Sequence, residues 1–143
     1  MKTLKDLLKG DRIHYVNKGT PVIDVIKFMD LHNVGAVPVL NEEKRLIGIF
    51  SERDLLRRVI VNEMNLYDTI VDDVMTKEVI VIEAHDSPEQ ALQVMKQKNF
   101  RHLPIIEDKT LIGILSIKDL MLHDLGEKTE QIKQLNTFIQ YAG

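Results

Sequence analysis

The sequence contains no cysteine, and this absence excludes disulfides, cysteine-ligated zinc and thiol chemistry. No apolar run approaches the ~20 residues that a membrane-spanning helix needs, and the opening MKTLKDLLKGDR lacks the apolar core and cleavage site of a signal peptide. The formal net charge is −3, and lysines and arginines alternate with acidic residues, unlike the basic surface of a nucleic-acid-binding protein. These absences predict a cytoplasmic protein that binds neither nucleic acid nor membranes.

The usual sequence signatures of catalysis are also missing. None of the histidines lies in an HExxH motif or is paired with another at i, i+4, so we expect no metal site. Neither GxGxxG nor GxxxxGKS/T occurs, which disfavours a dinucleotide-binding or phosphate-loop enzyme. Because no nucleophile and base stand in a recognisable arrangement, we expect no catalytic residues.

What the sequence does contain is a duplication. A shift of 66 positions aligns Pro38 with Pro104 and much of the sequence around them. One residue is lost in a polar turn, and a shift of 65 then aligns GIFSERDL, residues 48–55, with GILSIKDL, residues 113–120. The chain of 143 residues is long enough for one compact unit. We therefore predict two copies of one supersecondary unit.

Each copy shows the same order of periodicities. A short β-rich run is followed by apolar residues at helical spacing and then by two apolar runs separated by a polar turn. Ser87, Pro88 and Gln90 predict a capping box at the second copy's first helix, and Thr20-Pro21 is expected to begin its counterpart. Helices are also expected to follow Ser51 and Ser116.

The predicted fold class is therefore α/β (α+β), with the order β-α-β-β-α occurring twice. One such unit cannot cover both faces of its sheet, so the copies should pack sheet to sheet with their helices outside. We divide the chain into repeat 1, residues 1–66, repeat 2, residues 67–126, and a helical tail, residues 127–143. The tail is expected to pack on the body or on a second subunit.

These units, each with an apolar-Pro-apolar strand and a Gly-x-x-Ser-x-x-Asp ending, resemble the paired cystathionine-β-synthase (CBS) domain, or Bateman module, of the stand-alone type. The resemblance extends from about Leu4 to His123. It implies a pseudo-two-fold, non-catalytic energy or metabolite sensor that binds AMP, ADP, ATP, NAD or S-adenosylmethionine between the repeats. It further implies a homodimer that regulates an unknown protein target.

The resemblance also implies the ligand-binding residues of two clefts. One cleft would combine Thr20, Val34, Gly35 and Ala36 with Ser116, Lys118 and Asp119. The other would combine Asp86, Phe100, Arg101 and His102 with Ser51, Arg53 and Asp54. Relatives place phosphate-contacting basic residues at the positions of Arg101 and His102, whereas the first copy has Gly35-Ala36 there. The two clefts are therefore not expected to be equivalent.

The Ser-x-x-Asp pairs allow two interpretations. A carboxylate can accept hydrogen bonds from both hydroxyls of a ribose, and a serine at a helix N-terminus can contact a phosphate. The same pairs also form a helix cap, which needs no ligand. Capping and ligand contact explain the serines equally well, whereas we favour ligand contact for Asp54 and Asp119. The alternative function is a ligand-independent structural or protein-interaction module that dimerises.

Overall fold

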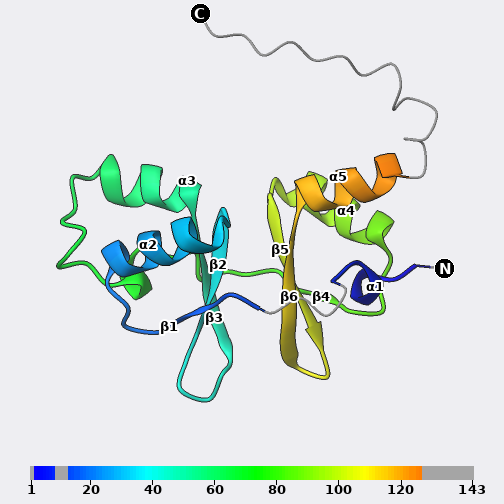
Figure 1. The fold of residues 1–143 in the computed structure, drawn as a ribbon, viewed down its shortest axis with the longest axis horizontal. Coiled ribbons are helices and arrows are strands. Elements are labelled where there is room, and N and C mark those ends of the chain that lie inside the picture. Colours follow the sequence, from blue (N-terminus) through cyan, green and yellow to red (C-terminus); the bar gives the residue numbers. More distant parts are fainter. Residues whose placement is uncertain (1, 9–12, 127–143) are drawn as a thin grey trace, which may run out of the picture.

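The computed structural model describes residues 2–8 and 13–126 (Figure 1). Two three-stranded sheets lie in the middle of the molecule, and helices flank them on the outside. We call residues 61–81, which join η1 to β4, the connector. The elements of repeat 1 and of the connector are α1 Leu4–Leu8, β1 Val16–Asn17, α2 Val22–His32, β2 Ala36–Leu40, β3 Leu46–Ser51, α3 Glu52–Asp54, the π-helix η1 Leu55–Ile60 and the 3-10 helix η2 Val71–Asp73. Those of repeat 2 are β4 Ile82–Glu83, α4 Pro88–Lys98, β5 His102–Glu107, β6 Thr110–Ser116 and α5 Ile117–Gly126.

The two sheets have the same topology, which confirms the predicted fold class. In each, the middle strand pairs in parallel with a two-residue strand and antiparallel with the strand that follows it. The register shifts just after Pro38 and Pro104, between Val39 and Leu40 and between Ile105 and Ile106. Strand β1 reaches only as far as Val39, so Pro38 leaves no ladder hydrogen bond unmade on that side.

The helix starts differ between the copies. Ser87 forms the predicted capping box with Gln90, and Pro88 occupies the first helical turn of α4. Helix α2 begins directly after Thr20-Pro21, as expected, but Thr20 does not cap it as Ser87 caps α4: α2 has no side-chain cap, and the Thr20 hydroxyl donates to the carbonyl of Asn17 at 2.6 Å. Both helices end at an asparagine with left-handed backbone geometry.

Two further expectations need adjustment. The helix after Ser51 is a single α-turn that continues as the π-helix η1, a wider form that often occurs at functional sites. The leading β-rich runs form only the two-residue strands β1 and β4. The predicted tail helix over residues 127–143 lies outside the described residues.

Each repeat's core is completed by a segment from outside its own sequence block. Leu4 of α1 is fully buried in the core of repeat 2, and its backbone N–H donates to the carbonyl of Asp86. Conversely, Val71 and Met75, which follow repeat 1, pack into the repeat 1 core. Figure 1 shows α1 on the side of repeat 2, far from β1. The sequence blocks and the packing units therefore differ at their edges.

The aligned glycines Gly48 and Gly113 lie where these segments cross the sheets. A Cβ atom at Gly48 would lie 2.5 Å from the Met75 sulfur, and one at Gly113 would lie 2.6 Å from a methyl carbon of Leu8. Both glycines therefore permit close packing of the crossing segments on the sheets.

Candidate functional site: clefts between the two repeats

A cleft of about 780 Å³ lies between the repeats, a size common among small-molecule sites. Its wall combines apolar side chains with a few charged ones, as in sites that hold a flat heterocycle and fix its polar groups. Repeat 1 contributes His14, His32, Val34 and Ala36, repeat 2 contributes Ile112 to Leu115, Asp119 and Leu122, and the segment around α1 contributes Lys2 and Asp6 to Leu8. We call this the Asp119 cleft.

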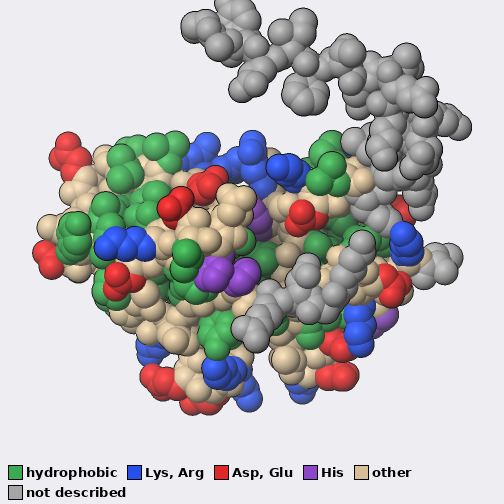
Figure 2. Space-filling model, viewed as in Figure 1, with side chains coloured by type: hydrophobic (Ala, Val, Ile, Leu, Met, Phe, Trp, Pro, Cys, Tyr) green, Lys and Arg blue, Asp and Glu red, His purple; other side chains and the backbone are tan. Residues whose placement is uncertain are grey.

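An aromatic stack stands at the wall of the Asp119 cleft. The rings of His14 and His32 are stacked, with centroids 4.0 Å apart, and the ring of Phe28 lies 4.4 Å from that of His32. Figure 2 shows histidine side chains gathered in the middle of the molecule, below a row of lysines and arginines at its upper edge. The stacked rings therefore give the cleft a flat, polarisable surface, and Lys2 places a positive charge in the same lining.

Asp119 combines a capping role with an exposed carboxylate. Its Oδ2 accepts a hydrogen bond of 3.0 Å from the backbone N–H of Ser116, and the Ser116 hydroxyl accepts one from the N–H of Asp119. Among the described residues, no further hydrogen-bond or ion-pair partner of this carboxylate occurs. Oδ1 is therefore available to a donor that enters the cleft.

His102 lies where the two repeats meet. Its Nε2 is close to Gly35, since a Cβ at Gly35 would lie 3.6 Å from it and equally far from the Glu52 carboxyl carbon. Burial lowers the pKa of His102 below its usual value of 6.5, although Glu52 and Asp119 oppose the shift. The positive charge of Arg101 adds to the lowering. The imidazole therefore favours its neutral form, and it adjoins residues of both repeats.

A second cleft, of about 400 Å³, lies where the connector meets repeat 2. Its lining residues are Arg58, Asp73, Met75 to Glu78 and Phe100. Phe100 comes from repeat 2 and the other residues from η1 and the connector. We call this the Asp54 cleft, because Arg58 and Thr76 both contact that carboxylate.

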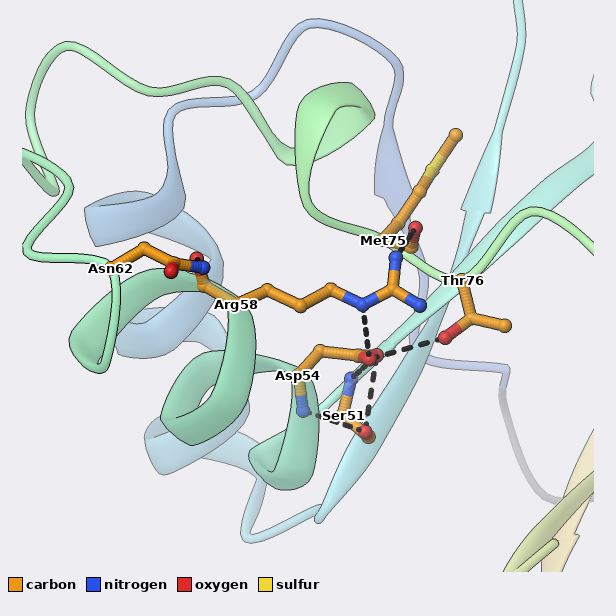
Figure 3. A network of polar contacts seen from close by, with 6 residues as sticks. All are labelled: Ser51, Asp54, Arg58, Asn62, Met75 and Thr76. Carbon is orange, nitrogen blue, oxygen red and sulfur yellow. Dashed lines mark hydrogen bonds and ion pairs between the residues drawn. The ribbon is translucent and has the colours of Figure 1, made fainter.

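The Asp54 carboxylate is surrounded by donors of the chain itself (Figure 3). Its Oδ2 accepts from the backbone N–H and the hydroxyl of Ser51, at 3.0 and 3.1 Å. Its Oδ1 accepts from the Thr76 hydroxyl at 3.1 Å and lies 3.5 Å from Nε of Arg58. The Asp54 side chain is only 10% exposed. We call Ser51, Asp54, Arg58 and Thr76 the Asp54 network.

The structure brings together only part of each predicted set. Val34, Ala36 and Asp119 line the Asp119 cleft, whereas Thr20, Gly35, Ser116 and Lys118 are not among its lining residues. Of the second set, Phe100 alone lines the Asp54 cleft, with Ser51 and Asp54 linked to it through the Asp54 network. Arg53 and Arg101 do not line it. Asp86 lies in the turn before α4, where its carboxylate accepts from the N–H of Glu83.

Several residues of the clefts were missed by sequence reasoning. Arg58 stands four positions after Asp54, a spacing at which ion pairs form on helices, so this contact was open to prediction. The stack of His14 on His32 joins residues far apart in sequence, and nothing in their spacing indicates it. The α1 residues reach the Asp119 cleft because α1 packs on the core of repeat 2 and not on the repeat that follows it in the chain.

Two features of other protein classes are absent from residues 2–8 and 13–126. No helix among them is long and apolar enough to cross a membrane. Within the same part of the chain, no three histidine or acidic side chains gather in a way that could hold a metal ion.

Comparison with known proteins agrees with this geometry. Residues 3–61 and 71–126 match the family described as the CBS domain, so the chain belongs to that family and carries two copies of the domain. The CBS domain-containing protein CBSX3, mitochondrial, of Arabidopsis thaliana is 39% identical over 123 residues. That match covers 83% of this chain but 60% of CBSX3, so the chain spans less than two thirds of that relative.

Solved structures share the fold over nearly the whole chain. A putative signal-transduction protein with CBS domains from Burkholderia ambifaria is 30% identical, with a TM-score of 0.80. The match covers 97% of this chain and all of that one, at 100%. CBSX2, solved in complex with AMP, is 27% identical with a TM-score of 0.72, over 90% of this chain and 99% of its own.

Proposed function

We propose that this protein is a non-catalytic regulatory module that binds an adenosine-containing ligand in the Asp119 cleft. The observation that carries the proposal is a cleft built by both repeats, with apolar and aromatic walls and an exposed carboxylate. The walls suit a purine, and Asp119 suits a ribose, whose two hydroxyls would donate to one carboxylate. A related pair of CBS domains, CBSX2, binds AMP.

Regulation follows from the place of the cleft between two packing units. A ligand that contacts both repeats binds better to the arrangement in which its two walls are correctly spaced. It therefore shifts the population toward that arrangement by as much as its affinities for the two states differ.

A thermal-shift panel tests the proposal. AMP, ADP, ATP, NAD and S-adenosylmethionine are each added to the wild-type protein, and the melting temperature is recorded against ligand concentration. At a ligand concentration of about 100 times Kd, binding to the folded state stabilises it by about 2.7 kcal/mol. Asp119→Asn keeps the shape of the side chain and should remove about half of the shift or more at the same ligand concentration. A panel without any ligand-dependent stabilisation would contradict the proposal.

The second candidate is a ligand-independent interaction module. It is favoured by the Asp54 network, in which Ser51 and Asp54 form a capping box and Thr76 occupies the other carboxylate oxygen. It is also favoured by two exposed apolar side chains, Leu56 on η1 and Met121 on α5, which occupy aligned positions of the two copies. Because these helices lie along one edge of the molecule (Figure 1), a second copy could cover both and form a homodimer.

The two candidates predict different ligand effects. A pure interaction module gives the same melting temperature with every nucleotide, whereas a sensor responds to at least one. Dimerisation is compatible with both.

Placement in the cytoplasm remains a prediction from composition, and the relative CBSX3 carries the word mitochondrial in its name.

A further inference from the structure

We infer that Arg58 and Thr76 determine which cleft takes the ligand. Their side chains occupy the Asp54 carboxylate, so that a ligand in the Asp54 cleft cannot use it. This inference rests on the proposed function and adds a specificity that the duplicated motif does not contain. The Ser-x-x-Asp pairs are alike in sequence, and the difference comes from what surrounds each carboxylate.

The Asp54 carboxylate already has the partners that a ribose would supply. The Thr76 hydroxyl donates to Oδ1 at 3.1 Å, in the way that a sugar hydroxyl would. The Arg58 guanidinium compensates the negative charge from 3.5 Å, and its Nη1 also donates to the carbonyl of Met75 at 2.9 Å. Figure 3 shows both side chains converging on Asp54 from different segments.

The connector that carries Thr76 is itself held in place. The backbone N–H of Thr76 donates to the carbonyl of Ile49 at 2.8 Å, and the N–H of Ile49 donates to the carbonyl of Thr76 at 2.9 Å. The Met75 side chain occupies the space left by Gly48. Thr76 is therefore positioned by two backbone bonds on a strand edge, and displacing its hydroxyl from Asp54 would disturb packed structure.

The second copy lacks the residue types that close the Asp54 cleft. In the alignment by 66 positions, Thr76 corresponds to Gly10, which has no side chain that could donate. In the alignment by 65 positions, Arg58 corresponds to His123, which is not an arginine. Asp119 is exposed, and its hydrogen bond from Ser116 uses only Oδ2.

The energetic consequence is a preference between the clefts. A ribose that entered the Asp54 cleft would have to replace existing charge-assisted bonds, so it would gain little over the unliganded state. In the Asp119 cleft, the same ribose would form new bonds to a carboxylate that water solvates in the free protein. The ligand therefore fills the Asp119 cleft and leaves the Asp54 cleft empty.

Isothermal titration calorimetry with AMP as the probe tests this inference on the full chain. The wild type should bind one equivalent per chain, and Asp119→Asn should weaken that binding about tenfold or more, the loss of a charged hydrogen bond. Arg58→Met/Thr76→Val should open the Asp54 cleft and raise the stoichiometry to two equivalents. Adding Asp54→Asn to that double variant should return it to one.

The matched control is Arg57→Met, which removes the same charge from the neighbouring exposed position and should leave the stoichiometry at one. Circular dichroism verifies folding, and Thr76→Val alone serves if the double variant does not fold. Wild-type binding of two equivalents, or an unchanged single equivalent in folded opening variants, overturns the inference while the proposed function stands. Absence of AMP binding to the wild type and every variant overturns the inference, and it overturns the proposed function as well when the thermal-shift panel shows no response to any of its ligands.

Discussion

At the scale of single residues, the environment of a side chain decides more than its type. Asp54 and Asp119 occupy aligned positions and both cap a helix. Asp54 is buried beside Arg58 and Thr76, whereas Asp119 faces a cleft between the repeats. The sequence correctly predicted a cap at both positions as one interpretation. It could not predict which carboxylate remains accessible, because that depends on residues from distant segments.

His102 supports a prediction about pH. Because burial lowers its pKa below 6.5, the unfolded chain binds more protons than the folded chain once the pH falls through 6.5. The free energy of unfolding should therefore decrease as the pH falls through 6.5. The full stabilising contribution of neutral, buried His102 should be present above that pH. Urea unfolding of the wild type and His102→Gln, compared at several pH values, measures the effect.

The difference in unfolding free energy between the two proteins should shrink as the pH is lowered. Glu52, Asp119 and Arg101 are the charged groups that act on this imidazole, and they are present in both proteins. Parallel stability profiles from about pH 7.5 to 5 would contradict the assigned role of burial.

At the scale of elements, the exchange of segments explains the aligned glycines. α1 crosses the sheet of repeat 2 at Gly113, and the stretch that follows η2 crosses the sheet of repeat 1 at Gly48. The sequence aligns these two glycines but contains no sign of the segments that pack on them. Chain connectivity suggests that a segment packs on the repeat that follows it directly. Here the apolar faces of α1 and η2 are buried on the other repeat instead.

A Cβ at these glycines should cost different amounts. Gly48→Ala places its methyl 2.9 Å from the Thr76 carbonyl oxygen, which is backbone, as well as against Met75. The three atoms nearest to the methyl of Gly113→Ala all belong to the side chain of Leu8, which can rotate. Overpacking costs about 1–3 kcal/mol, so Gly48→Ala should fall at the upper end and Gly113→Ala at the lower end.

Urea unfolding of both glycine variants measures the two losses of stability. Equal losses, or a greater loss for Gly113→Ala, would show that the backbone contact at Gly48 relaxes freely. Gly19→Ala is not a suitable control, because Gly19 has a φ of 84° and would be strained for another reason.

The anchoring of α1 gives a third prediction. Leu4→Ala removes a fully buried side chain from the core of repeat 2 and should cost about 2–5 kcal/mol. The aligned variant Ile70→Ala should cost less, since Ile70 is 38% exposed. Hydrogen exchange should accelerate in β5 and β6 for Leu4→Ala. Acceleration confined to the strands of repeat 1 would contradict the observed packing.

At the scale of the whole molecule, the duplication produces a surface with its own approximate symmetry. Leu56 and Met121 are aligned in sequence, and their side chains are 59% and 52% exposed. A two-fold interface uses the same patch on both partners, and a patch that is itself nearly symmetric meets that requirement readily. The predicted homodimer is thus a proposal that the surface supports.

Disruption of this patch tests the dimer. Leu56→Glu/Met121→Glu places four carboxylates in the proposed interface of two chains and should convert a dimer into monomers, because buried unpaired charges are costly. Light scattering coupled to size-exclusion chromatography gives the mass. Leu31→Glu on α2, where the leucine is 77% exposed, is the control and should not change it. A wild-type monomer, or a dimer that persists in the double variant, would refute the interface.

The sequence by itself determined the duplicated unit, the order of its elements and the capping motifs, because hydrophobic periodicity and capping chemistry are local and repeat within each copy. Tertiary structure alone decided the exchange of α1 and η2 between cores, the stacking of His14 on His32 and the closure of the Asp54 cleft. These features join segments that are distant in the chain, and their free energy depends on burial and mutual geometry. The carboxylates of two aligned Ser-x-x-Asp motifs thus acquire different accessibility when the chain folds.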